Sequence, residues 1–158
     1  MRKRTVDKQV KKYIVFSDIH SDKHSLLKIK QLAEKCDGVF FAGDGYSLAK
    51  TINDELYAVG GNCDLGGSPE LVAEIEGVRV LLTHGHRYGV KSSLLPLTLR
   101  ARELDCSLAV FGHTHIPFCS YENGVFLLNP GTCSGFGRKT YATLTLDNGI
   151  VKADVHDL

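Results

Sequence analysis

Residues 13–20, YIVFSDIH, decide how this chain is interpreted. Four apolar residues in succession are typical of a strand that is buried on both faces, as in the parallel sheets of α/β proteins. Asp18 and His20 follow this run and are two positions apart. If the extended backbone continues through them, both side chains project from the same face of the strand end. The stretch therefore predicts a buried strand whose carboxyl end offers a carboxylate and an imidazole to one ion.

The same pattern, an apolar run followed by polar side chains of metal-binding type, recurs along the chain. It places Asp44 after residues 38–42, Asn62 after residues 55–59, His84 and His86 after residues 78–82, and His113 and His115 after residues 107–111. In open α/β sheets, ligands bind beyond the carboxyl ends of the strands. Carboxylate, carboxamide and imidazole groups suit Mn²⁺, Fe, Zn²⁺ or Mg²⁺ rather than copper or an iron–sulfur cluster. The pattern favours a metal site over scattered core and surface histidines such as His24.

The segments between these runs predict helices and hairpins. Apolar residues at helical spacing predict helices over residues 21–36 and 92–104, and residues 46–52 fit either a helix or a turn. Apolar runs on either side of short polar turns predict three hairpins, namely 70–75 with 78–82, 118–121 with 125–128, and 141–146 with 150–155. Strand–helix units followed by an antiparallel meander predict two packed sheets flanked by helices.

Length and composition predict a single globular domain. The 158 residues are 43% hydrophobic and 23% charged, which is ordinary for a protein with one sizeable core. We divide the chain into a basic N-terminal tail, residues 1–12, and one domain, residues 13–158. The tail resembles no signal peptide, and no stretch reaches the roughly 18 to 20 apolar residues that span a bilayer. Five widely spaced cysteines suit reduced thiols. We expect a cytoplasmic protein with no membrane partner.

Five ordered motifs resemble those of the calcineurin-like metallophosphoesterase superfamily, and within it those of the single-domain YfcE-type phosphodiesterases. They are Asp18-x-His20, Gly43-Asp44, Gly61-Asn62-Cys63-Asp64, Thr83-His84-Gly85-His86 and Gly112-His113-Thr114-His115. The similarity runs from Tyr13 nearly to the end of the chain. It implies a four-layer αββα sandwich, in which two mixed β-sheets are flanked by helices.

The resemblance also implies a two-metal site and a role for each residue. Asp18, His20 and His115 are expected to hold one ion, Asn62, His84 and His113 the other, and Asp44 to bridge both. The expected ions are Mn²⁺, with Zn²⁺, Ni²⁺, Fe²⁺ and Mg²⁺ as alternatives. Two such ions roughly 3.5 to 4 Å apart clamp a phosphate and generate hydroxide near neutral pH. The expected catalytic residues are Asp44, Asn62 and His86, the last lying near the phosphate.

The implied function is a metal-dependent phosphodiesterase that hydrolyses a small phosphodiester or nucleotide through a metal-activated hydroxide. Cys63 stands where many members have a histidine that protonates the leaving group. Because a neutral thiol is a poor proton donor, the enzyme would favour good leaving groups or recruit another acid such as His86. Residues 43–47 lack the arginine and second acidic residue of protein Ser/Thr phosphatases. This difference argues against a phosphoprotein substrate.

A protein-interaction scaffold is the alternative, because the retromer subunit Vps29 resembles this fold and works mainly through protein contacts. In Vps29 the residue that corresponds to Asn62 is altered, whereas this chain has all seven expected metal ligands. We therefore favour the enzyme. Exposed apolar patches would favour the scaffold. The net charge of +1 argues against nucleic acid as a partner. A homo-oligomer is also compatible with the sequence.

Overall fold

The computed structural model describes residues 10–158, and strand β1 (Lys11–Phe16) lies at the centre of its first sheet. Alternate side chains of a strand point to opposite faces of the sheet. Tyr13 and Val15 accordingly pack into a core between two sheets, whereas Ile14 and Phe16 pack on the other face. The buried strand expected within residues 13–20 is confirmed, with Lys11 rather than Tyr13 as its first residue and Phe16 as its last.

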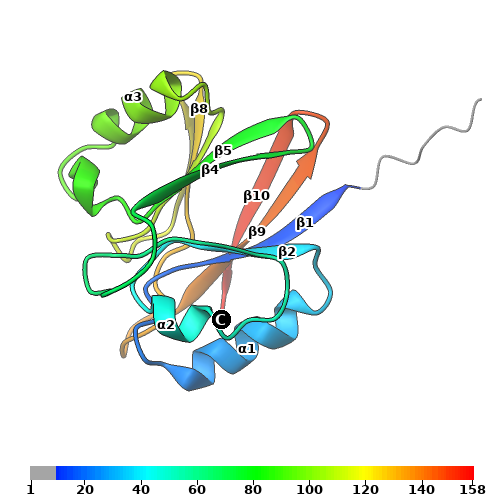
Figure 1. The fold of residues 1–158 in the computed structure, drawn as a ribbon, viewed down its shortest axis with the longest axis vertical. Helices are drawn as coiled ribbons and strands as arrows, with labels where there is room; N and C mark the ends of the chain where they lie inside the picture. The colour runs from blue at the N-terminus through cyan, green and yellow to red at the C-terminus, as the bar shows by residue number, and fades with distance from the viewer. Residues whose placement is uncertain (1–9) are drawn as a thin grey trace, which may run out of the picture.

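Nine further strands complete the two sheets of this part of the chain. They are β2 (Gly38–Phe41), β3 (Leu56–Ala58), β4 (Glu70–Ile75), β5 (Val78–Thr83), β6 (Leu108–Val110), β7 (Phe118–Glu122), β8 (Val125–Asn129), β9 (Thr140–Asp147) and β10 (Ile150–Asp157). The strand orders are β10-β9-β1-β2-β3 and β4-β5-β6-β8-β7, and the two sheets lie face to face (Figure 1). Both sheets are mixed. In the first, β1 pairs parallel with β2 and antiparallel with β9. In the second, β6 pairs parallel with β5 and β8, while β4 and β5 pair antiparallel.

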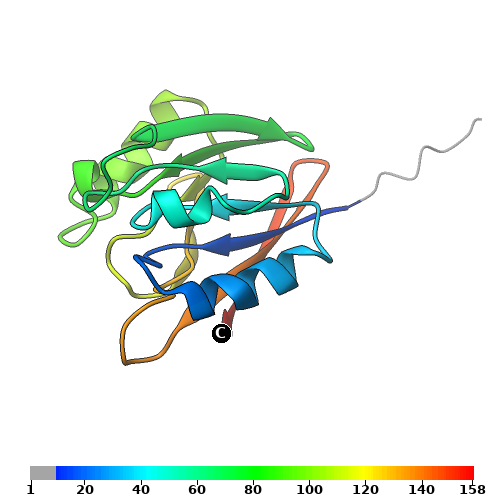
Figure 2. The ribbon, with the colours of Figure 1, turned by 60° about the horizontal axis from the view of Figure 1, so that its bottom comes forward.

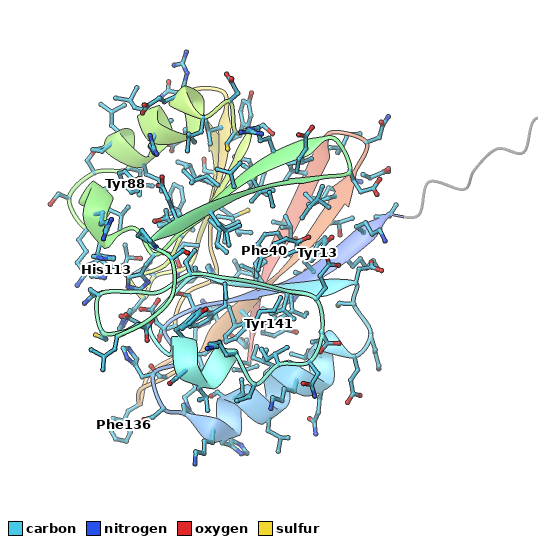
Figure 3. All side chains as sticks on the ribbon, in the orientation of Figure 1. Tyr13, Phe40, Tyr88, His113, Phe136 and Tyr141 are labelled. Atoms are coloured by element: carbon cyan, nitrogen blue, oxygen red, sulfur yellow. The ribbon has the colours of Figure 1, made fainter. Side chains whose placement is uncertain are left out.

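Helices cover the outer face of each sheet and complete four layers (Figure 2). Helices α1 (Lys23–Ala33) and α2 (Tyr46–Ala49) lie on the first sheet, and α3 (Leu95–Glu103) lies on the second. Between the sheets, the rings of Tyr13 and Phe40 meet edge to face, with centroids 5.1 Å apart (Figure 3). One apolar cluster fills each space between layers. The predicted αββα sandwich is confirmed.

The predicted antiparallel meander at the end of the chain is wrong. The hairpin of β7 and β8 belongs to the second sheet, where β8 also pairs parallel with β6, and the hairpin of β9 and β10 belongs to the first. Each hairpin forms as predicted because its turn, such as Asn123-Gly124 or Asn148-Gly149, places two residues at positive φ. Such local signals determine which strands form a hairpin but not which sheet that hairpin joins.

The helices are shorter than predicted. Residues 21–36 contain a helix only from Lys23 to Ala33, because the Asp22 carboxylate accepts a hydrogen bond from the Ser25 backbone N–H at 3.0 Å and so caps its first turn. The helix expected over residues 92–104 spans Leu95–Glu103, with Pro96 in its first turn as anticipated. Of residues 46–52, only Tyr46–Ala49 are α-helical.

We expect the carboxylate of Asp22 to stabilise the fold at neutral pH and to lose this effect in acid. Its hydrogen bond with Lys139 (2.8 Å) and then that with Ser25 lower the pKa of Asp22 to about 2. Because the unfolded pKa is about 3.9, the stabilisation is fully present above pH ~4 and is lost as the pH falls through the folded value.

Asp22→Asn keeps an oxygen that can cap the helix but carries no charge. Wild type should therefore exceed this variant by about 1 kcal/mol in free energy of unfolding at pH 7. The difference should shrink between about pH 4 and pH 2, as measured by chemical unfolding at several pH values. A difference that stays constant over this range would contradict the assignment.

The predicted basic tail, residues 1–12, coincides only in part with the described chain. Residues 1–9 lie outside the described residues, while Lys11 and Lys12 belong to β1. Within residues 10–158, no helix has both the length and the apolar character needed to cross a membrane.

Candidate metal centre

The loops that follow β1, β2, β5 and β6 meet at one end of the two sheets. The Asp18 N–H donates to Gly43 O at 2.9 Å, and the Gly112 N–H donates to His84 O at 3.0 Å, so backbone hydrogen bonds hold the loops together within each sheet. A third bond, from the His113 N–H to Asp18 Oδ2 (3.1 Å), joins the two sheets. His113 lies at this end of the molecule, away from the core rings of Tyr13 and Phe40 (Figure 3).

Asp18, His20 and His115 form the first group of donor atoms, all within 4.8 Å of one another. The Asp18 side chain is fully buried, and its Oδ2 accepts hydrogen bonds from Ser17 Oγ (2.6 Å) and the His113 N–H. Its Oδ1 lies 3.1 Å from His115 Nε2, yet has no hydrogen-bond partner among the described residues. A buried carboxylate oxygen without a partner is unfavourable, and a bound cation would compensate it. The donor set therefore fits a metal ion.

Asp44, His84 and His113 form the second group, again within 4.8 Å of one another. His84 Nε2 lies 3.2 Å from Asp44 Oδ2 and 3.2 Å from His113 Nδ1, and 2.9 Å from Asn62 Oδ1. On the other side of its ring, His84 Nδ1 lies 2.7 Å from the carbonyl oxygen of Ala42. That contact fixes the ring and leaves Nε2 toward the group, an arrangement that orients histidine ligands in metal sites.

The conformation that brings these side chains together differs from the expected one. Extended backbone was expected to align residues two positions apart, but five of the site residues have left-handed φ values: Asp18 (55°), His20 (51°), Asp44 (65°), His113 (71°) and His115 (64°). Asp and His adopt this region more readily than bulky or β-branched residues do. The chain thus turns sharply after each strand. Such conformations persist where the surrounding structure enforces them, and they cluster at functional sites.

Asp64 holds the Asp44 loop against the Asn62 loop, a role that the sequence analysis missed. Its carboxylate accepts four backbone hydrogen bonds of 2.8 to 3.0 Å, from Gly61, Asp44, Gly45 and Tyr46. Burial acts to raise the pKa of Asp64, but these backbone donors outweigh it and lower the pKa below its ordinary value. The position of Asp64 just after Gly60 and Gly61 could have indicated this role. Aspartate side chains in turns commonly accept hydrogen bonds from nearby backbone N–H groups.

His86 and Cys63 lie beside the two groups. The His86 ring centroid is 5.5 Å from that of His84, and its Nδ1 is buried without a partner in the described chain. Burial, followed by His84 and Arg87, lowers the pKa of His86. The Cys63 sulfur lies within 4.8 Å of donor atoms of His20 and Asp44, and burial followed by Asp44 raises the pKa of its thiol. Both side chains are therefore neutral at neutral pH.

The two remaining histidines lie outside both groups, as expected. His24 is exposed in the first turn of α1. His156 belongs to β10, where its Nε2 lies 2.8 Å from Thr143 Oγ1. An exposed histidine outside the site provides a matched control for substitutions within it.

Comparison with known proteins shows the family of the chain. The model of a family described as the calcineurin-like phosphoesterase superfamily domain matches residues 12–149. The chain belongs to this superfamily. A relative from Bacillus subtilis, the probable metallophosphoesterase YsnB, is 34% identical over 151 residues, which cover 91% of this chain and 89% of the relative. The crystal structure of a predicted phosphoesterase from Streptococcus pneumoniae has a TM-score of 0.82 and 25% identity, covering 94% of this chain and 90% of that one.

Two solved structures of lower identity share the fold. An archaeal phosphodiesterase has a TM-score of 0.74 and 22% identity, covering 92% of this chain and 99% of its own. Vps29 from Entamoeba histolytica, whose structure contains Zn²⁺, has a TM-score of 0.68 and 21% identity, covering 92% and 98%. At these identities the similarity shows the fold alone. Family membership places the chain among the metallophosphoesterases, a family that uses divalent metal ions.

Proposed function

We propose that this calcineurin-like phosphoesterase is a phosphodiesterase that hydrolyses a small phosphodiester or nucleotide at a centre of two divalent ions. The observation that carries the proposal is the fully buried Oδ1 of Asp18, which lies 3.1 Å from His115 Nε2 and 3.8 Å from His84 Nε2. A cation at this point would satisfy the Asp18 carboxylate and the His115 imidazole together, with the His84 imidazole on the side of the second ion. The donors suit Mn²⁺, with Zn²⁺, Ni²⁺, Fe²⁺ and Mg²⁺ as alternatives.

We assign Asp18, His20 and His115 to one ion, Asn62, His84 and His113 to the other, and Asp44 to both. Such a pair of ions supplies a nucleophile from water near neutral pH and neutralises charge on the phosphate. Asp44 is well placed for a shared role because its Oδ1 accepts the Cys63 N–H at 2.9 Å while its Oδ2 faces His84. Its carboxylate is thus held by the backbone rather than free to turn.

His86 is proposed to bind the substrate phosphate as a neutral imidazole. Its lowered pKa means that it carries little positive charge at neutral pH, so it donates a hydrogen bond rather than a proton. Cys63, with its raised pKa, is equally poor as an acid. The site therefore favours substrates whose leaving group needs no protonation. Asp44, Asn62 and His86 remain the proposed catalytic residues.

A second candidate function is binding to a partner protein, which is the scaffold alternative drawn from the resemblance to Vps29. Exposed apolar side chains near the loops of the proposed metal centre support it. Leu65, Ile116 and Phe136 have relative exposures of 110%, 67% and 111%. Phe136 points outward at the edge of the molecule (Figure 3). The same side chains would serve a homo-oligomer. The expectations of a cytoplasmic location and of no nucleic-acid partner remain predictions from the sequence.

Hydrolysis of bis-p-nitrophenyl phosphate tests the enzymatic proposal. Metal-stripped protein should be inactive and should recover when Mn²⁺ or one of the alternative ions is returned. His20→Ala and His115→Ala should each lose about 100-fold in turnover, because each removes a proposed ligand. Both residues are exposed, so their replacement should leave the protein folded.

His24→Ala is the matched control and should retain wild-type turnover. A folded wild-type protein that is inactive with all five ions would refute the phosphodiesterase and leave partner binding as the function to test. Equal losses in His24→Ala and His20→Ala would show that the assay does not report on the proposed centre.

A further inference from the structure

Two hollows of different chemical character are lined by residues next to the proposed metal ligands in sequence. One, of about 410 Å³, is lined by the apolar residues Val90, Leu94, Phe111, Ile116 and Phe118 together with Lys91 and Thr114. Another, of about 460 Å³, lies on the side of Cys63, and its walls include Tyr46, Ser47, Lys50 and Asp64. The apolar hollow thus includes Thr114, which lies between His113 and His115, and the polar hollow includes Cys63, which follows Asn62.

The apolar hollow adjoins the proposed centre. Thr114 lies between the proposed ligands His113 and His115, and its Oγ1 accepts hydrogen bonds from Asn129 Nδ2 (2.9 Å) and the Ile116 N–H (3.1 Å). These bonds hold the wall of the hollow in a fixed position relative to both histidines. Lys91 contributes positive charge on the same side. The lining residue Thr114 is one position from each histidine, so a phosphate held by these histidines would lie near the hollow.

The hollow has the features of a preformed binding site for an apolar group. Val90 and Phe111 belong to the buried cluster between the second sheet and α3, so the inner wall is part of the core. Ile116 forms an outer wall and is 67% exposed, so an apolar ligand would remove its side chain from water. Volumes of several hundred Å³ are typical of small-molecule sites.

We infer that the substrate of the proposed phosphodiesterase carries an apolar or aromatic group on one side of its phosphate, and that this group binds between Val90, Phe118 and Ile116. The inference rests on the proposed function. The polar hollow at Tyr46 and Lys50 then takes the second, polar group of the diester. The substrate class is an asymmetric phosphodiester with one apolar group.

Binding of two phosphonates to the Mn²⁺-loaded protein tests this inference by calorimetry. Methylphosphonate presents only the phosphate-like head, whereas phenylphosphonate adds an aromatic ring. Wild type should bind phenylphosphonate about tenfold more tightly. Ile116→Asn should reduce this ratio to about one and leave the affinity for methylphosphonate unchanged, because the substitution introduces no charge. Leu99→Asn, an exposed position on α3 outside the hollow, should keep the wild-type ratio.

The outcomes separate this inference from the function on which it rests. Equal affinity of wild type for both phosphonates, with hydrolysis of bis-p-nitrophenyl phosphate intact, overturns the apolar site but not the phosphodiesterase. A preference for phenylphosphonate that survives in Ile116→Asn also overturns the apolar site. Failure of both phosphonates to bind, together with absent hydrolysis, overturns both proposals.

Discussion

Asp18→Asn should weaken Mn²⁺ binding by about 100-fold or more while leaving the metal-free protein at least as stable as wild type. The asparagine carbonyl oxygen can keep the hydrogen bonds that Asp18 Oδ2 accepts from Ser17 Oγ and the His113 N–H. Its amide group would replace the unpartnered Oδ1 and donate toward His115 Nε2, 3.1 Å away. The variant removes a buried charge without removing its supporting contacts, so only metal affinity should suffer.

Calorimetric titration with Mn²⁺ and thermal unfolding in the presence of a chelator measure the two effects separately. Asp154→Asn is the control, because it makes the same chemical change at an exposed position in β10 and should alter neither quantity. A metal-free Asp18→Asn protein that unfolds at a clearly lower temperature than wild type would show that Asp18 has a structural role instead.

Gly112→Ala should lower the free energy of unfolding by about 3 kcal/mol and weaken metal binding as well. A Cβ at this position would lie 2.0 Å from Ser17 Oγ and 2.8 Å from Asp18 Oδ2. The backbone has little freedom to move away, because the Gly112 N–H donates to His84 O (3.0 Å) and its carbonyl accepts from Asn129 Nδ2 (3.2 Å). Relief of the clash must therefore displace Ser17 or Asp18.

Chemical unfolding of Gly112→Ala beside Gly137→Ala checks this expectation. A Cβ at Gly137 would meet nothing within 4 Å and the backbone there has no positive φ, so this control should stay close to wild type. A loss in Gly112→Ala of less than about 1 kcal/mol would mean that the loop after β6 adapts more readily than its hydrogen bonds suggest.

Local sequence patterns predicted the layers and also predicted that the side chains at the strand ends lie close together, as the structure shows. Continuous burial along Tyr13–Phe16 requires cores on both faces of β1. The apolar runs before Asp44, His84 and His113 mark strand ends that lie at one end of the two sheets. The resemblance to a known superfamily then supplied the αββα arrangement. Residue type at strand ends carried most of the information about the site.

Features that depend on distant contacts could not be predicted in the same way. The left-handed backbone at Asp18 and His113 reflects hydrogen bonds between loops that are far apart in the chain. Asp64 was overlooked as a support because its four backbone partners come from two loops, only one of which adjoins it in sequence. The division of the last two hairpins between the sheets depends likewise on packing, since their turn sequences are alike.

Each group of donor atoms draws on both sheets. Asp18 and His20 follow a strand of the first sheet and His115 follows one of the second, while Asp44 follows the first and His84 the second. An ion held by either group would thus act as a cross-link between two halves that otherwise meet through an apolar core. Metal affinity and the docking of the sheets are then thermodynamically linked. Substitutions deep in that core, at Phe40 for instance, would alter metal occupancy without touching a ligand.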